Sequence, residues 1–156
     1  MEISKVPNSI LAKKLVAIPS EDIGGKGLKE LIADMRVSMK EHHGIGLSAN
    51  QIGKDLRLFV IDPALAGEYG IPDAFINPEI TEYSKDEDEL EEGCLSIPKY
   101  YTAIKRAKKV KIKAYDEDGK KFKFRARGLL ARVLQHETDH LNGITIKDRY
   151  APNPKH

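Results

Sequence analysis

The sequence predicts a single-domain α+β protein, in which antiparallel or mixed β-sheets pack around a central C-terminal helix, with one amphipathic helix near the N-terminus. The chain has 156 residues, the length of one domain with a sizeable core. Residues 129–141 place apolar side chains at helical spacing, and residues 110–126 alternate apolar and basic residues about an Asp-Gly turn, which is typical of a β-hairpin. We expect one domain over residues 1–150 and a short tail over residues 151–156.

Composition excludes several classes of protein. The chain is 40% hydrophobic and 32% charged, as expected of a globular protein rather than a disordered one. No apolar run approaches the roughly 20 residues that span a bilayer, and neither a signal-peptide core nor an Arg-rich leader precedes Arg36, so we expect a cytoplasmic protein without membrane contact. The net charge of +2 gives no indication of DNA binding, and the single cysteine, Cys94, excludes an internal disulfide.

The N-terminal part is expected to contain two helices and one buried strand. Asn8 or Ser9 can cap a short helix that runs to Leu15. Residues 27–43 form the longer, amphipathic helix, and residues 56–61 form a strand buried on both faces. The apolar side of the longer helix, in which methionines are expected to pack rather than to bind a ligand, consists of Leu28, Leu31, Ile32, Met35 and Met39.

The segments between the buried strand and the hairpin are harder to assign. We expect a loop over residues 63–73 and two short strands, 74–76 and 80–83, separated by an Asn-Pro pair. Residues 86–92 hold six acidic residues in seven and are interpreted as an exposed loop. After the C-terminal helix, residues 144–146 are expected to be extended.

The C-terminal helix carries a His-Glu-x-x-His pattern. His136 and His140 are four residues apart and lie on one face of a helix, where both imidazoles can bind one metal ion. Glu137 lies about 100° from His136 around the helix and can reach a water molecule there without being a ligand. The pattern is typical of metal-dependent hydrolysis, although chance spacing of polar residues gives the same letters.

A third ligand separates the known classes of such sites. No glutamate follows Glu137, which excludes the peptidases that take one downstream, and Ile146 occupies the third-histidine position of the extended motif. His42 and His43 end a helix whose apolar face must pack elsewhere. Cys94 is the better candidate, because two histidines and one thiolate leave a fourth position of a tetrahedral ion open. A structural role for this cysteine remains the alternative.

Residues 44–53 contain three glycines and one amide side chain that a simple connection would not need. Composition alone favours a link between a helix and a strand. Gln51, however, stands among small and apolar residues, where its amide needs partners and can donate a hydrogen bond to an oxyanion without adding charge.

Three segments together resemble the motifs of the peptide deformylase family. Residues 44–51 (Gly-Ile-Gly-Leu-Ser-Ala-Asn-Gln) are similar to the first motif, with Ser48 where alanine is usual. Residues 92–96 (Glu-Gly-Cys-Leu-Ser) match the second in full, and residues 135–143, which contain Gln-His-Glu-x-Asp-His, match the third. The order and spacing of the motifs are compatible with the family over nearly the whole chain.

This resemblance implies a metal-dependent hydrolase that removes the formyl group from N-formyl-methionine of nascent polypeptides and releases formate. Cys94, His136 and His140 would bind one divalent metal, in the family usually Fe²⁺, which Zn²⁺, Ni²⁺ or Co²⁺ can replace. Glu137 would take a proton from the attacking water and deliver it to the leaving amine.

The resemblance also assigns residues to the transition state and to the substrate. Gln51 and the backbone N–H of Leu95 would stabilise the tetrahedral oxyanion. Ile45, Gly46 and Gly93 would hold the substrate backbone.

Two departures from the family lead to further expectations. Many bacterial members continue beyond the position of Tyr150 into a C-terminal helix that docks on the ribosome. We expect the basic hairpin 109–127 to contact the ribosome in its place. The usual alternative is that the basic side of such a hairpin only faces solvent. Arg132 replaces an apolar residue beside the pocket for the methionine side chain. It can extend outward or pair with an acid such as Glu92, and we expect it to alter side-chain preference.

Two other functions are compatible with the same motifs. The protein could be another metal-dependent amidase or peptidase, which cleavage of an internal peptide bond would reveal. It could also be a non-catalytic homologue that binds metal or ribosomes, although such a protein would be expected to lack a ligand or the base, and neither is missing here.

Overall fold

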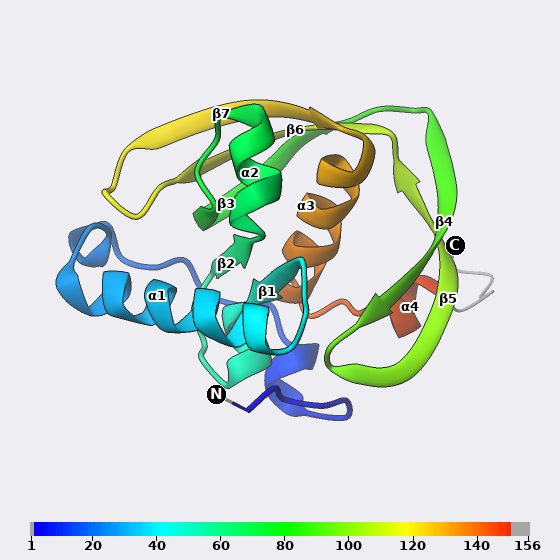
Figure 1. Cartoon of the computed structure of the whole chain (residues 1–156), viewed down its shortest axis with the longest axis horizontal. Helices are drawn as coiled ribbons and strands as arrows, with labels where there is room; N and C mark the ends of the chain where they lie inside the picture. The colour runs from blue at the N-terminus through cyan, green and yellow to red at the C-terminus, as the bar shows by residue number, and fades with distance from the viewer. Residues whose placement is uncertain (1, 151–156) are drawn as a thin grey trace.

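The computed structural model describes residues 2–150, with the side chain of Tyr150 excepted, and has an α+β fold (Figure 1). The predicted tail, 151–156, lies outside the described residues. All strand pairs are antiparallel; they form a five-stranded sheet in the order β1-β2-β3-β6-β7 and a two-stranded ribbon of β4 and β5. The strands are β1 (Gly46–Ser48), β2 (Leu58–Ile61), β3 (Ala74–Tyr83), β4 (Glu87–Cys94), β5 (Ile97–Ala107), β6 (Lys109–Tyr115) and β7 (Lys121–Arg127).

The helices cover the two faces of the sheet and join it to the ribbon. They are α1 (Lys26–Glu41), α2 (Pro63–Tyr69), α3 (Gly128–Leu141) and α4 (Ile146–Tyr150), with 3₁₀ turns η1 (Ser9–Ala12), η2 (Ser20–Asp22) and η3 (Ala49–Ile52). α3 lies between the sheet and the ribbon, which confirms the central C-terminal helix (Figure 1). Among the described helices, none combines the length and apolar character that a bilayer crossing requires.

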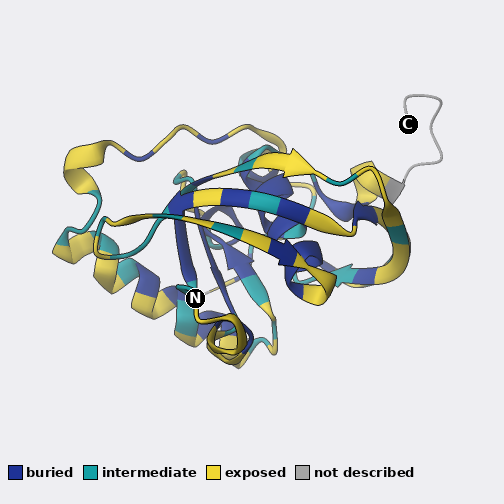
Figure 2. Cartoon of the chain, turned by 90° about the horizontal axis from the view of Figure 1, so that it is seen from above, coloured by how far each residue is buried: buried dark blue, intermediate teal, exposed yellow. Residues whose placement is uncertain are grey.

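Strand β2 explains why the sheet has a core on each face. Its residues alternate: Phe59 packs with the cluster that contains the apolar side of α3, and Val60 packs with the cluster that contains the apolar side of α1. All four residues of β2 are buried, as the apolar run predicted. Phe59 also stacks on Phe75 of β3, with ring centroids 4.8 Å apart. Figure 2 shows these buried strands at the centre and the exposed outer side of α1.

Helix α1 confirms the amphipathic prediction. Ile32, Met35 and Met39 are buried against the sheet, so both methionines pack in the core as expected. The shorter N-terminal helix differs from the prediction: it is a 3₁₀ turn that ends at Ala12 instead of Leu15, although Asn8 caps it through a 3.1 Å hydrogen bond from the backbone N–H of Ile10.

Three predictions between and after the main elements were wrong. Residues 63–73 are not only a loop, because Asp62 accepts a hydrogen bond from the N–H of Ala64 and starts α2 with a proline in its first turn. Residues 74–83 form one strand, in which Asn77 adopts a positive φ of 50° and produces a register shift rather than an end. Residues 144–146 were predicted as a short strand or extended segment, but 144 and 145 belong to no strand and Ile146 begins helix α4.

The acidic segment was also misassigned, because it forms strand β4 rather than an exposed loop. It pairs with β5, which the sequence did not predict, and the register places Asp88 opposite Arg106 and Glu89 opposite Lys105. Several of its acids are exposed, but Glu92 is buried. Strand β4 is mostly acidic, and the buried Ile97 and Ile104 stand far apart in β5, so hydrophobic alternation did not reveal the ribbon.

The predicted hairpin is confirmed as β6 and β7. Val110, Ile112 and Ala114 pack into the core with Ala126, while the opposite side faces outward. We call this outward side the basic face; it consists of Lys109, Lys111, Lys113, Lys121, Lys123, Arg125 and Arg127.

Candidate metal centre

Helix α3 presents polar residues toward the ribbon because the ribbon satisfies them. Gln135 is the clearest case: its amide oxygen accepts from the N–H of Ala107 at 3.1 Å, and its amide nitrogen donates to the carbonyl of the same residue at 2.9 Å. The side chain therefore pairs with the end of β5 as a strand would. This contact fixes α3 against the ribbon and places His136 and His140 opposite the end of β4.

Cys94, His136 and His140 converge, as the sequence predicted. The Nε2 atoms of the two histidines are 3.2 Å apart, and the Cys94 Sγ atom is 3.3 Å from Nε2 of His140. All three donor atoms lie within 4.8 Å of one another. Metal–nitrogen bonds of about 2.1 Å and a metal–sulfur bond of about 2.3 Å place tetrahedral ligands about 3.3–3.6 Å apart, so this donor set fits one divalent cation.

The other ring nitrogen of His136 is fixed by Glu92. Nδ1 of His136 lies 3.0 Å from Oε1 of Glu92. A carboxylate in this position holds the histidine with Nε2 directed at the metal position. Burial alone would raise the pKa of Glu92, but hydrogen bonds from His136 and Arg106 outweigh it and hold the pKa well below the ordinary value.

Arg106 connects this carboxylate to the end of α3. Its Nε and Nη2 atoms donate to the two oxygens of Glu92 at 3.0 and 2.9 Å, and its Nη1 atom donates to Asp139. Arg149 then donates two further hydrogen bonds to Asp139, at 2.9 and 2.8 Å. The Arg106 side chain is only 3% exposed, so its charge is balanced by these buried carboxylates rather than by water.

Arg132 completes the group. It donates to Glu92 and to the carbonyl of Ile104 through Nη1, and to Asp88 through Nη2, with 2.7 Å between Nη2 and Oδ1. The expected pairing with Glu92 is therefore present, and Arg132 is buried rather than extended into solvent. We call Glu92, Arg106, Arg132 and Asp139 the buried charge cluster.

Glu137 lies beside the metal position but is not one of the three converging donors. Its Oε2 atom is 3.9 Å from Nε2 of His136, and its Oε1 atom is buried without a hydrogen-bond partner among the described residues. Burial raises the pKa of Glu137 to about 7. A β-carbon on Gly46 would lie 2.6 Å from Oε2 of Glu137, so only glycine permits this approach of β1 to α3.

His140 is the most enclosed of the candidate ligands. It is 1% exposed, and its Nδ1 atom has no hydrogen-bond partner within residues 2–150. Burial, together with the neighbouring His136, lowers the pKa of His140 well below its ordinary value. The imidazole is therefore neutral, which is the form that binds a metal.

Gln51 directs its amide nitrogen toward the thiol. The Nε2 atom is 3.6 Å from Sγ of Cys94 and donates to Oγ of Ser96 at 3.1 Å. The amide oxygen accepts from the backbone N–H of Ser48 at 3.0 Å and lies 3.1 Å from the Ser48 hydroxyl. Ser48 therefore fixes which end of the amide faces the centre, so this departure from the family pattern is compatible with a donor role for Gln51.

A cavity of about 530 Å³ opens above these residues. The predicted substrate-binding positions Ile45, Gly46 and Gly93 all line it. The predicted oxyanion donors Gln51 and Leu95 line it as well, together with Cys94, His136 and Glu137. A β-carbon on Gly93 would lie 2.4 Å from the Tyr101 ring, which explains the glycine. Of the rejected ligand candidates, His43 lies in the cavity wall and the Nδ1 atom of His42 lies 2.8 Å from the carbonyl of Ser38.

Sequence reasoning missed the groups that support the ligands. Arg106 and Asp139 were not singled out, and Tyr101 was not expected beside Gly93. The available signal was indirect: a buried glutamate next to a ligand cysteine requires cationic partners. The sequence does not show which of 26 lysines and arginines supply them.

The fold and the site define a single-domain α+β protein with one Cys-His-His centre and an adjacent glutamate, the arrangement of a metal-dependent hydrolase. The family model for polypeptide deformylase matches residues 1–156, and the chain belongs to this family. The family is metal-dependent and its members are enzymes.

Relatives and solved structures agree. The chain is 45% identical to peptide deformylase from Dictyoglomus thermophilum over 148 residues, which cover 95% of this chain and 91% of that protein. It is 46% identical to the Mesorhizobium japonicum peptide deformylase over 143 residues, with 92% and 80% covered. The crystal structure of peptide deformylase from Thermotoga maritima has a TM-score of 0.87 at 37% identity and covers 97% of both chains. A Synechococcus elongatus peptide deformylase in complex with actinonin has a TM-score of 0.89 at 35% identity, with 98% and 82% covered.

Proposed function

We propose that this protein removes the formyl group from N-formyl-methionine at the N-terminus of nascent polypeptides and releases formate and a free amine. The observation that carries the proposal is the convergence of Cys94, His136 and His140 beside Glu137, whose buried carboxylate oxygen has no partner among the described residues. A carboxylate held in this way is available to a water molecule and a substrate in the cavity.

We assign the metal to Cys94, His136 and His140 and propose Fe²⁺ as the native ion, with Zn²⁺, Ni²⁺ or Co²⁺ able to replace it. A divalent cation held there would lower the pKa of a water molecule to near 7 and would polarise a carbonyl oxygen. Because two imidazoles and a thiolate suit both iron and zinc, the identity of the ion requires purification without oxygen followed by metal analysis.

The chain's own groups move the proton and bind the developing charge. Glu137 takes the proton from the attacking water and delivers it to the leaving amine; such a base typically contributes 10²–10⁴-fold. The amide nitrogen of Gln51 and the backbone N–H of Leu95 donate to the oxyanion, and one donor of this kind is worth about 10²–10³-fold. The backbone at Ile45, Gly46 and Gly93 holds the extended substrate in the cavity.

A peptide assay tests the proposal. The metal-loaded protein is expected to release formate from a formyl-Met-Ala-Ser peptide, but to leave the N-acetyl form and an internal peptide bond intact. Glu137→Ala is expected to bind the metal and to lose turnover. Absence of formate release by the loaded wild type would support the non-catalytic alternative, and cleavage of the internal bond would support a peptidase.

The ribosome is proposed as a partner, through the basic hairpin 109–127. The contact is supported by the outward, strongly cationic basic face and by the proposed substrate, which emerges from the ribosome. We propose the cytoplasm as the location for the same reason. Replacement of all seven cations of this face by glutamine is expected to abolish co-sedimentation with ribosomes. Unchanged co-sedimentation would contradict this contact.

A further inference from the structure

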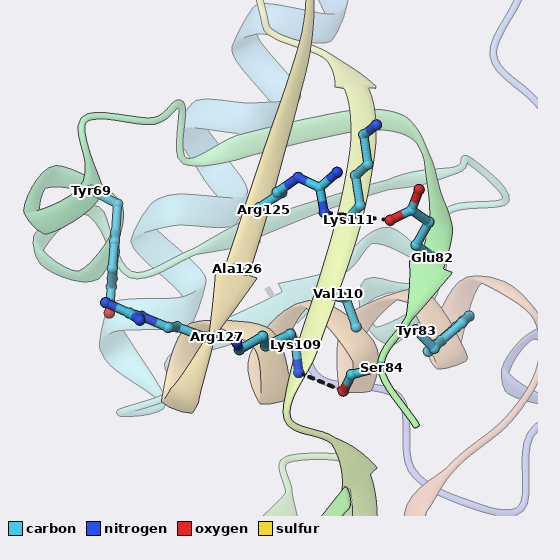
Figure 3. Close-up of a pocket in the computed structure, with 10 residues that line it drawn as sticks. All are labelled: Tyr69, Glu82, Tyr83, Ser84, Lys109, Val110, Lys111, Arg125, Ala126 and Arg127. Atoms are coloured by element: carbon cyan, nitrogen blue, oxygen red, sulfur yellow. Dashed lines mark hydrogen bonds and ion pairs between the residues drawn. The ribbon is translucent and has the colours of Figure 1, made fainter. Parts of the chain in front are cut away.

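A second hollow lies on the basic face, away from the metal centre. It has a volume of about 550 Å³ and is formed where β3, β6 and β7 meet α2 (Figure 3). Its lining combines four cations with two tyrosines: Lys109, Lys111, Arg125, Arg127, Tyr69 and Tyr83. Figure 3 shows the tyrosines on either side of the cations, with Arg127 extending toward Tyr69.

The register of the hairpin places like charges directly opposite each other. Lys109 faces Arg127, Lys111 faces Arg125, and Lys113 faces Lys123. Directly opposed like charges destabilise a sheet. Three consecutive pairs of this kind conflict with folding, and such a local conflict is typical of a functional surface.

Acids on β3 relieve only part of this repulsion. Glu79 pairs with Lys113 at 3.3 Å, and Glu82 pairs with Arg125 at 3.4 Å. Within residues 2–150, the side chains of Lys109 and Arg127 form no ion pair, and both are exposed. The positive charge is therefore least balanced at the end of the hairpin where the hollow lies.

The aromatic groups distinguish among polyanions. Tyr69 is 41% exposed and contacts Phe124 with its ring edge, so its ring keeps free surface in the hollow. Tyr83 lies opposite Val110, on the other side of the sheet from Lys109 and Lys111, and so is not part of the basic face. Cations that neutralise phosphates next to rings on which bases stack are the combination that binds unpaired nucleic acid. An acidic polypeptide would use the cations but would gain little from an exposed ring.

We propose that this hollow binds an unpaired segment of RNA, with Lys109 and Arg127 on the phosphates and Tyr69 stacked on a base. Ribosomal RNA is the source to which we commit, and that choice alone rests on the proposed function. The site is separate from the catalytic cavity, so RNA binding and deformylation of a short peptide are independent properties.

Binding of the loaded protein to a fluorescent 12-nucleotide oligouridine, measured over a range of salt concentrations, tests the proposal. Lys109→Gln with Arg127→Gln is expected to weaken binding and to lower the slope of log affinity against log salt by about one for each cation removed. Tyr69→Ala is expected to weaken binding about fivefold or more. Lys14→Gln with Lys54→Gln removes two exposed lysines elsewhere and is the matched control.

Unaltered turnover of a formylated tripeptide shows that each variant is folded. Absence of RNA binding by the wild type, or an unchanged affinity and salt slope in the Lys109 and Arg127 variant, would overturn the proposal. Polyglutamate is the competing ligand: an equal loss of polyglutamate and RNA binding in Tyr69→Ala would show a site for acidic proteins instead and would also overturn it.

A different observation concerns the wall of the catalytic cavity. Arg132 lines this cavity beside Leu129 and Val133, so an uncompensated guanidinium there would favour acidic substrate side chains. The carboxylate of Glu92 also accepts two hydrogen bonds from Arg106 and faces His136. Arg132 pairs with Glu92 through Nη1, but Glu92 is shared with Arg106 and His136. Asp88 therefore supplies Arg132 with a second acid and holds Nη2 through both its carboxylate and its backbone carbonyl.

The geometry points to Asp88 as a positioning residue for side-chain selection, an inference that rests on the proposed function. It lies outside the cavity lining, and its side chain is 44% exposed, whereas that of Arg132 is 8% exposed. By holding the guanidinium toward β4, Asp88 leaves the aliphatic stem of Arg132 to face the substrate. The cavity consequently selects an uncharged first side chain such as methionine.

The selectivity between formyl-Met-Ala-Ser and formyl-Glu-Ala-Ser, taken as the ratio of their kcat/KM values, tests this role. Asp88→Asn is expected to reduce the ratio about fivefold through a lower KM for the glutamate peptide, and added salt is expected to restore it. Glu89→Gln, which removes an exposed charge from the same strand, is the control and should leave the ratio unchanged. Equal losses on both peptides, or an unchanged ratio, would overturn the role of Asp88, whereas no turnover of either peptide by the wild type would overturn the proposed function itself.

Discussion

The buried charge cluster and the basic face contain the same kinds of side chain in opposite circumstances. In the cluster, Arg106 is 3% exposed and donates to two carboxylates, and the arginines and acids match in number. On the basic face, Arg125 is 74% exposed, and seven cations share the two acids of β3. Buried charges persist only with partners, because desolvation is costly, whereas water and salt screen surface charges. The cluster is therefore part of the structure, and the basic face is available for binding.

The largest effect is expected when one arginine from each region is replaced. Arg106→Met leaves Glu92 and Asp139 buried without their shared cation and is expected to cost about 3–5 kcal/mol of unfolding free energy. Arg125→Met, the same substitution on the basic face, is expected to change stability by no more than about 0.5 kcal/mol. Urea unfolding of both variants measures the difference, and similar costs would show that burial does not distinguish the two regions.

A second test asks whether the buried charge cluster contributes to metal affinity as well as to stability. Glu92→Gln removes the charge that faces His136 and is expected to weaken metal binding by about 10–100-fold, because partners of ligand histidines have effects of this size. Competition with a chelator gives the affinity. Glu89→Gln on the same strand is the control, and an equal effect of both substitutions would contradict a specific role for Glu92.

The smallest expected effect has the opposite sign. Lys123 lies on the edge strand β7, and its cross-strand partner is Lys113. Lys123→Glu replaces a repulsive pair by an attractive one and is expected to stabilise the protein by roughly 0.2–1 kcal/mol. Thermal unfolding at low salt measures the gain. A loss of stability would show that the opposed charges of the hairpin are not in conflict.

The same contrast explains which parts the sequence could predict. Helical spacing and the elimination of other ligands led to Cys94, His136 and His140, because these arguments depend on local geometry and on chemistry. The hairpin followed from its alternation of apolar and basic residues. Strands β4 and β5 were missed because their inner side contains ion pairs, and a pair such as Arg106 with Glu92 depends on tertiary contacts that no local pattern records.

Because α3 lies between the five-stranded sheet and the ribbon, a metal ion at this centre would connect two layers of the fold as well as take part in the chemistry. Cys94 belongs to the ribbon, whereas His136 and His140 belong to the helix that packs on the five-stranded sheet. An ion held by all three joins the two layers at one point, much as a cross-link would. The free energy of metal binding would then also hold the ribbon against the helix, so the protein would be more stable with the ion than without it.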